Sequence, residues 1–190
     1  MKGLLIIGCI CLFSCSGSKS QSLSNEVPCQ EGINLLPMYG KVEKCPLQLK
    51  ADSAFLAYCD QQFQSRTEAF DFHRETGWRY MNEGDLDTAM KRFNQAWLLD
   101  KDNPSVYCCF GWLLGKKNKN EEAVLFFEKA VSMKPADVEI LKFAGLGYNE
   151  LYKRSKNATY HKKALELLNK GLILSPENTS IKGVIKEISE

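Results

Sequence analysis

Apolar residues recur every three to four positions along most of the chain after residue 46, with polar and charged residues between them. This spacing places apolar side chains on one face of an α-helix, so the pattern predicts a mostly helical protein. The first series predicts one amphipathic helix within an N-terminal extension at 29–65. Its apolar positions are Leu49, Phe55, Leu56, Cys59 and Phe63. Ser65 then precedes Glu68 by three residues, which is a capping-box signal for the next helix.

The helical pattern repeats itself in the C-terminal two thirds of the chain. Gly77, Gly111 and Gly145 are each separated by 34 positions, and alanine and phenylalanine positions downstream keep the same step. In the third unit the counterpart of Ala123 is Ala164, which comes 41 positions later, so seven residues (41 minus 34) are inserted between its two helices. Self-similarity at this period predicts stacked helical hairpins.

Three stretches carry the repeat most fully: GWRYMNEGDLDTAMKRFNQAWLLDKDN, GWLLGKKNKNEEAVLFFEKAVSMKPAD and GLGYNELYKRSKNATYHKKALELLNKGLILSPEN. They resemble the tetratricopeptide repeat family. The resemblance implies an all-α solenoid of helical hairpins over 66–190, with repeats at about 70–103, 104–137 and 138–178 and a capping helix at 179–190. Glycine and alanine let the paired helices approach closely, and the larger apolar side chains fill the space between them.

The resemblance also implies a binding site, the concave groove lined by the first helix of each hairpin. The groove positions in this sequence are Arg74, Trp78, Met81, Asn82, Cys108, Trp112, Lys116, Lys142, Leu146 and Asn149, with Asp71, Glu139 and Glu150 beside them. One subset of the family grips a peptide C-terminus with lysine, asparagine and arginine at set groove sites. Only Arg74 fits that pattern, so a receptor of this kind is not expected.

Trp78 and Trp112 occupy the same position in successive repeats, so we expect them side by side on the concave surface. Two tryptophans in register suggest an apolar strip for a ligand side chain. The alternative is that the N-terminal helix from Leu47 folds over them and the strip is ordinary core. The sequence leaves both interpretations open.

The N-terminus has the pattern of a secretory signal: Lys2, an apolar run at 4–13, then a small residue and Cys15. A run of about ten residues is too short to span a bilayer. LFSC at 12–15 resembles the lipobox of bacterial lipoproteins, which implies removal of 1–14 and lipidation of Cys15. The serine-rich residues 15–28 would then tether the domain to a membrane of the bacterial envelope, and Ser16 favours the outer membrane. Ordinary secretion, or release into the periplasm, is the alternative.

The remaining cysteines suggest one disulfide. An exported chain permits disulfides, and Cys29 and Cys45 bracket a loop that contains proline and glycine, so they are a candidate pair. Cys108 and Cys109 are adjacent on a predicted helix and cannot jointly ligate zinc in the way a CxxC pair can. We interpret them as packing residues, and thiol-redox chemistry remains the remote alternative.

Composition and motifs favour a non-catalytic protein. The 190 residues are 25% charged with a net charge of +2, so no global field would attract nucleic acid. No catalytic motif is present, and neither His73 nor His161 has a partner at metal-ligand spacing. We therefore expect no enzyme activity, no cofactor and no metal, and a protein or peptide partner. An assembly factor similar to the pilotin lipoproteins of secretion channels is an alternative.

The basic insertion at 152–163 either binds an acidic partner or lipid headgroups, or is a solvated helix extension.

Overall fold

The computed structural model describes residues 27–189, and every regular element in that range is helical. The fold is therefore all-α, as the periodicity predicts. Two short 3-10 helices precede eight α-helices. The elements are η1 (Ile33–Leu35), η2 (Pro37–Lys41), α1 (Pro46–Gln62), α2 (Arg66–Glu83), α3 (Leu86–Leu99), α4 (Pro104–Lys116), α5 (Asn120–Met133), α6 (Val138–Ser155), α7 (Ala158–Leu174) and α8 (Thr179–Ser189).

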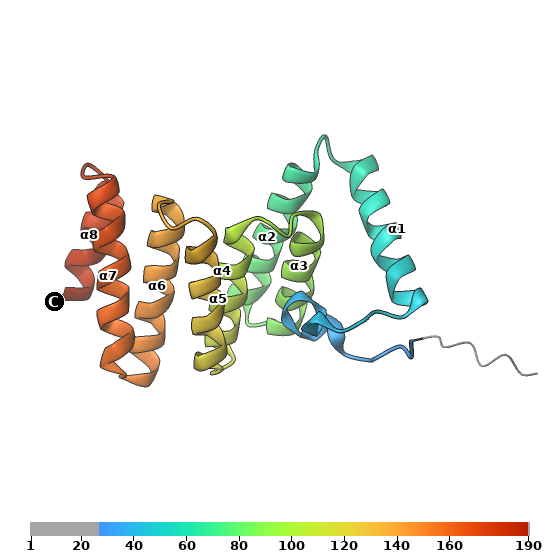
Figure 1. The fold of residues 1–190 in the computed structure, drawn as a ribbon, viewed down its shortest axis with the longest axis horizontal. Coiled ribbons are helices and arrows are strands. Elements are labelled where there is room, and N and C mark those ends of the chain that lie inside the picture. The colour runs from blue at the N-terminus through green and yellow to red at the C-terminus, as the bar shows by residue number, and fades with distance from the viewer. Residues whose placement is uncertain (1–26, 190) are drawn as a thin grey trace, which may run out of the picture.

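Helices α2 to α7 form three hairpins that stand side by side in one elongated row, and α8 closes the row at its C-terminal end (Figure 1). The pairs are α2 with α3, α4 with α5, and α6 with α7, which matches the three repeats inferred from the sequence. The first hairpin begins at Arg66, four residues before the expected start of the first repeat. The cap at α8 seals the end by burying Ile181 completely.

The repeated glycines are sites of close approach within each hairpin. A Cβ placed on Gly111 would lie 2.6 Å from Cε1 of Phe127, and one on Gly145 would lie 2.8 Å from Cγ of Leu168. Gly77 faces Phe93 in the same way. Each first helix therefore leaves room for one large side chain of its partner helix, which explains why the glycine repeats with the 34-residue period.

Local capping interactions fix where the helices begin. Ser65 Oγ accepts a hydrogen bond from the Glu68 backbone N–H at 3.1 Å, as the capping box predicts. The reciprocal bond differs, because Glu68 Oε2 accepts from the backbone N–H of Gln64, at 2.8 Å, rather than from Ser65. Gly84 ends α2 in the left-handed region, at φ 88°, and Asp85 caps α3 by accepting from the Thr88 N–H.

The seven inserted residues lengthen both helices of the third hairpin. Helices α6 and α7 contain 18 and 17 residues, compared with 13 in α4 and 14 in α5. The added turns pack on each other, since the rings of Tyr152 and His161 lie 4.8 Å apart. Seven residues are about two helical turns, so Ala164 and Leu168 still face α6 and are buried.

The N-terminal extension contains one α-helix, α1, as expected, but much of that helix's apolar face is exposed. Only the C-terminal part of α1 packs well: Cys59 is buried, but Leu49 is 53% exposed and Leu47 is 71% exposed. Phe63 lies just beyond the helix as its C-cap. Within residues 27–189, helix α1 contacts α2 and α3 at the N-terminal end of the row (Figure 1), and its first turns leave Leu47 and Leu49 largely exposed.

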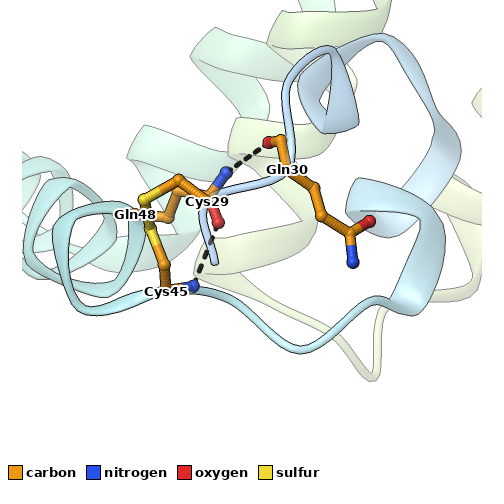
Figure 2. Close-up of a disulfide and its surroundings, with 4 residues drawn as sticks. All are labelled: Cys29, Gln30, Cys45 and Gln48. Atoms are coloured by element: carbon orange, nitrogen blue, oxygen red, sulfur yellow. Dashed lines mark hydrogen bonds between the residues drawn. A yellow bond between two sulfur atoms is a disulfide. The ribbon is translucent and has the colours of Figure 1, made fainter. Parts of the chain in front are cut away.

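A disulfide between Cys29 and Cys45 ties the start of the extension to the N-terminus of α1. Figure 2 shows the Gln48 side chain hydrogen-bonded to Cys45 and to Gln30, the residue after Cys29. Its Nε2 donates to the Gln30 carbonyl at 2.7 Å, and its Oε1 accepts from the Cys45 N–H at 3.1 Å. The pairing that the sequence suggested is therefore present in the structure.

Among residues 27–189, none of the helices is both long and apolar enough to span a bilayer. The expected signal at 1–14 and the lipidation site Cys15 lie outside the described residues.

Candidate functional site

Three aromatic rings from the three first helices meet in one cluster on the groove side of the array. Trp78 of α2 and Trp112 of α4 are in edge contact, with ring centroids 5.6 Å apart. Phe143 of α6 lies 5.3 Å from Trp78 and stacks on Trp112 at 5.9 Å. All three side chains are partly buried. The indole N–H of Trp112 donates to the Phe143 carbonyl at 3.3 Å, which links α4 to α6.

The structure places α1 away from this aromatic cluster. Helix α1 contacts α2 and α3 at the N-terminal end of the row (Figure 1), whereas the cluster extends to Trp112 of α4 and Phe143 of α6. The rings around Trp78 come from Phe93 of α3, Trp112 and Phe143. The rings are therefore shielded by one another and not by the N-terminal helix, and each keeps part of its surface exposed.

Polar and charged side chains flank the aromatic cluster. Arg74 pairs with Asp71 at 3.1 Å and lies 3.7 Å from Glu75, and Lys142 pairs with Glu139 at 2.6 Å. These cations are therefore partly neutralised by their own helices, which makes them poor anchors for a peptide carboxylate. The other accessible groove positions are Asn82, Lys116, Leu146 and Glu150, and Glu150 pairs with Arg154.

Three of the residues expected in the groove are buried instead. Cys108 is 0% exposed, Met81 is 3% and Asn149 is 5%. Cys108 occupies the same repeat position as Arg74 and Lys142, whose long side chains extend past the neighbouring helices, but a cysteine is too short to do so. Met81 and Asn149 lie seven residues, or about two turns, further along their helices and are covered there. The accessible part of the groove is therefore narrower than the sequence suggested.

The adjacent thiols of α4 are packed in the core. Burial raises the pKa of Cys109 to about 12, although a hydrogen bond from Trp78 and the charge of Arg74 oppose that increase. Burial also raises the pKa of Cys108 well above its ordinary value. Thiol chemistry requires the thiolate, so this environment disfavours the redox alternative.

The structure brings His73 next to Cys59, a contact that the sequence spacing did not reveal. His73 Nε2 lies 3.8 Å from the Cys59 sulfur, and the rings of Phe55, Phe63 and Phe72 surround the imidazole. Burial, aided by the charge of Arg92, lowers the pKa of His73 to about 4, so the ring is neutral at pH 7. The two groups come from different helices, which is why no local motif marks them. Among residues 27–189, no group of three potential ligands could hold a metal ion.

The basic insertion forms the tip of the third hairpin. Several of its cations are already paired: Lys153 with Glu187 at 3.6 Å, and Lys163 with Glu166 at 2.8 Å. Lys156 lies 5.9 Å from the ring centroid of Tyr152. These contacts favour the interpretation as a solvated helix extension over that of a dedicated binding loop.

Comparison with known proteins gives a match in the middle of the array. The family model described as "Tetratricopeptide repeat" matches residues 104–137, which are the α4–α5 hairpin and its following turn. No curated protein matches the chain.

Several solved structures are similar to the chain. The first tetratricopeptide domain of Spaghetti (RPAP3), bound to the HSP90 peptide SRMEEVD, is 19% identical, with 63% of this chain and 90% of that chain covered and a TM-score of 0.47. The Arabidopsis OM64 tetratricopeptide domain is 18% identical, with 66% and 98% covered and a TM-score of 0.48. YrrB, described as a tetratricopeptide protein with an unusual peptide-binding site, is 18% identical, with 74% and 66% covered and a TM-score of 0.46.

The hairpins on both sides of the matched segment repeat its construction, with a glycine of the first helix against a large side chain of the second. The α4–α5 hairpin therefore matches the tetratricopeptide repeat model, and α2–α3 and α6–α7 share its construction, so the fold is an all-α array of tetratricopeptide-like hairpins.

Proposed function

We propose that this protein is a non-catalytic scaffold that binds a protein or an extended peptide through the groove formed by α2, α4 and α6. The observation that carries the proposal is the partly exposed aromatic cluster of Trp78, Trp112 and Phe143, which runs across all three first helices. Partly exposed aromatic side chains in the centre of a polar surface are typical of the residues that dominate binding at protein interfaces.

The side chains around the aromatic cluster determine which kind of ligand the groove binds. An apolar side chain of the ligand packs on the exposed ring surfaces, and the ligand backbone lies between Lys116 and Asn82. Arg74 and Lys142 are engaged by carboxylates of their own helices, so recognition depends on apolar contact more than on a ligand charge. Such a groove suits an internal peptide segment with a bulky apolar residue.

Variants that change the charge of the groove test this proposal. In Lys116→Glu and Asn82→Arg the changed side chains are not buried, so folding is preserved while the path beside the cluster is altered. Purified wild-type and variant proteins are compared by cross-linking and mass spectrometry in detergent-solubilised envelopes. We expect specific partners to be lost with both variants and retained with Lys170→Glu, an exposed lysine on α7. An identical set of cross-links for all four proteins would exclude the groove as the binding site.

We further propose that the protein is a lipoprotein of the bacterial envelope, anchored through Cys15. The apolar run that ends in LFSC supports the anchor. The Cys29–Cys45 disulfide supports an oxidising compartment, because disulfides persist in exported proteins. The serine-rich stretch at 15–28 is of a composition that suits a flexible tether.

Replacement of the acylated cysteine tests the anchor. Cys15→Ala should lose labelling by a palmitate probe and move to the soluble fraction, whereas Cys9→Ala, within the apolar run, should keep both label and membrane association. Continued labelling of Cys15→Ala would rule out this lipidation site.

A further inference from the structure

A cavity separate from the groove lies where η2 of the N-terminal extension meets α3, α4 and α5. Its volume is about 510 Å³, which is within the range of about 300–1,000 Å³ of sites that hold small ligands or single side chains of a partner. Apolar and aromatic groups make up its walls. They are Met38 from η2, Trp97 from α3, Tyr107 from α4, and Leu125 and Phe126 from α5.

Hydrogen bonds to α3 hold the wall that the extension contributes. The Nδ2 group of Asn94, a fully buried residue of α3, donates to the carbonyls of Asn34 and Leu36 at 3.0 and 2.9 Å. Met38 and Tyr39 adopt left-handed backbone conformations, with φ of 53° and 56°. Non-glycine residues are disfavoured in this conformation, so tertiary contacts must hold this turn in place.

The polar atoms of the aromatic walls are already satisfied within the protein. The indole N–H of Trp97 donates to the hydroxyl of Tyr107 at 3.3 Å, and that hydroxyl donates to the Lys101 carbonyl at 2.7 Å. Tyr39 packs against Trp97 with ring centroids 6.3 Å apart. The aromatic walls therefore present ring surfaces and no free hydrogen-bonding groups, which suits an apolar occupant.

Lysines surround this apolar cavity. Lys41 and Lys129 line it, and Lys101 lies over the Trp97 ring at 4.9 Å. Lys129 also lies over the Tyr107 ring, at 5.8 Å. Within residues 27–189, none of these three lysines takes part in an ion pair, and the cavity lining contains no carboxylate. The rim therefore carries three lysines that form no ion pair within the described residues, and their positive charge complements an anion.

From this combination we infer that the cavity binds a peptide segment in which a bulky apolar side chain stands next to a carboxylate. The side chain occupies the space between Trp97, Phe126 and Met38, and the carboxylate lies among the lysines of the rim. A polypeptide fits better than a free small molecule because Leu125, one of the walls, is 65% exposed, so the apolar surface extends from the cavity to the outside of the protein. This site is separate from the groove and does not depend on it.

A designed peptide tests the inference. The probe is acetyl-Gly-Ser-Gly-Ser-Gly-Phe with a free terminal carboxylate, added to the full-length protein and followed by the NMR signals of the Trp97 indole and the Leu125 methyls. We expect saturable shifts at both. The same peptide with a terminal amide should bind at least fivefold more weakly, because the rim lysines lose their partner. A terminal alanine in place of phenylalanine should weaken binding to a similar degree.

Variants of exposed residues separate binding from folding. Leu125→Ser and Lys129→Gln should each raise the Kd at least threefold without a change in melting temperature, while Lys186→Gln on α8 should leave the Kd unchanged. Equal affinity for the acid and amide peptides, unperturbed Trp97 signals, or equally tight binding of free N-acetyl-phenylalanine would each overturn the proposal, the last in favour of a small-molecule site.

Discussion

The contact between Gly111 and Phe127 gives a quantitative test of how the repeats are packed. In Gly111→Ala the added methyl would lie 2.6, 2.8 and 3.0 Å from three carbons of the Phe127 ring, whereas carbons in contact are about 3.5–4.0 Å apart. The ring must therefore move by about 1 Å. It cannot simply move away from α4, because its other side approaches Gly147 of α6, where an added Cβ would also clash with Phe127.

The expected cost comes from two opposing effects. Overpacking of a well-filled core destabilises by about 1–3 kcal/mol, and alanine gains about 1 kcal/mol over glycine in a helix interior. Gly183→Ala in α8 isolates the second effect, because a Cβ there meets no atom within 4 Å. The difference in unfolding free energy between the two variants should therefore be about 1–3 kcal/mol. For a chain of this size each kcal/mol shifts the melting temperature by about 2–4 °C.

Denaturant titration and thermal melting of both variants measure this difference. The double variant Gly111→Ala with Phe127→Leu should be more stable than the sum of the two single effects predicts, since leucine removes the ring edge that the methyl meets. A coupling of about 0.5–3 kcal/mol is usual for residues in direct contact. If Gly111→Ala is as stable as Gly183→Ala, or if the effects of Gly111→Ala and Phe127→Leu simply add, Gly111 and Phe127 are not in the close contact that the structure shows.

Three further predictions concern the N-terminal half. The pKa of His73 in the folded protein, about 4, is below its ordinary value of 6.5, so the unfolded state binds more protons between these two pH values. The contribution of His73 to the free energy of unfolding should therefore be fully present above pH 6.5 and fall by about 3 kcal/mol towards pH 4. In denaturant titrations, His73→Leu should flatten that pH profile. Reduction of the Cys29–Cys45 disulfide should accelerate amide exchange at 33–41 about a hundredfold, because closure of such a loop stabilises by about 3 kcal/mol. Asn94→Ala should accelerate exchange in the same segment by losing two hydrogen bonds of about 1 kcal/mol each, while Asn169→Ala on the exposed face of α7 should not.

The repeat architecture was predictable because each hairpin uses the same local contact. Glycine at one position requires a large side chain sixteen residues later, so Gly77 with Phe93 and Gly111 with Phe127 leave a regular trace in the sequence. The insertion also left a trace, because it shifted the downstream pattern without breaking it. These features depend on residues near each other along the chain.

Contacts that depend on distant parts of the chain were not predictable. The turn of η2 and the hydrogen bonds from Asn94 join the extension to the repeats across about sixty residues of sequence, and no periodic pattern marks them. The burial of Cys108 also could not be predicted from its place in the repeat. Family position places it beside the ligand path, but side-chain length and the neighbouring helices determine whether it reaches the surface.

Helical phase restricts which insertions and deletions the third hairpin can accept. Its extra turns extend beyond the other hairpins, and they keep Ala164 and Leu168 in phase because seven residues are close to two full turns. Shortening by five residues would instead rotate α7 by about 140° and turn these side chains away from α6, whereas shortening by seven would preserve the interface. Viable length variants of this hairpin should therefore differ in steps of about seven residues, and a foreign peptide inserted at its tip, between Ser155 and Ala158, would leave the phase of both helices intact.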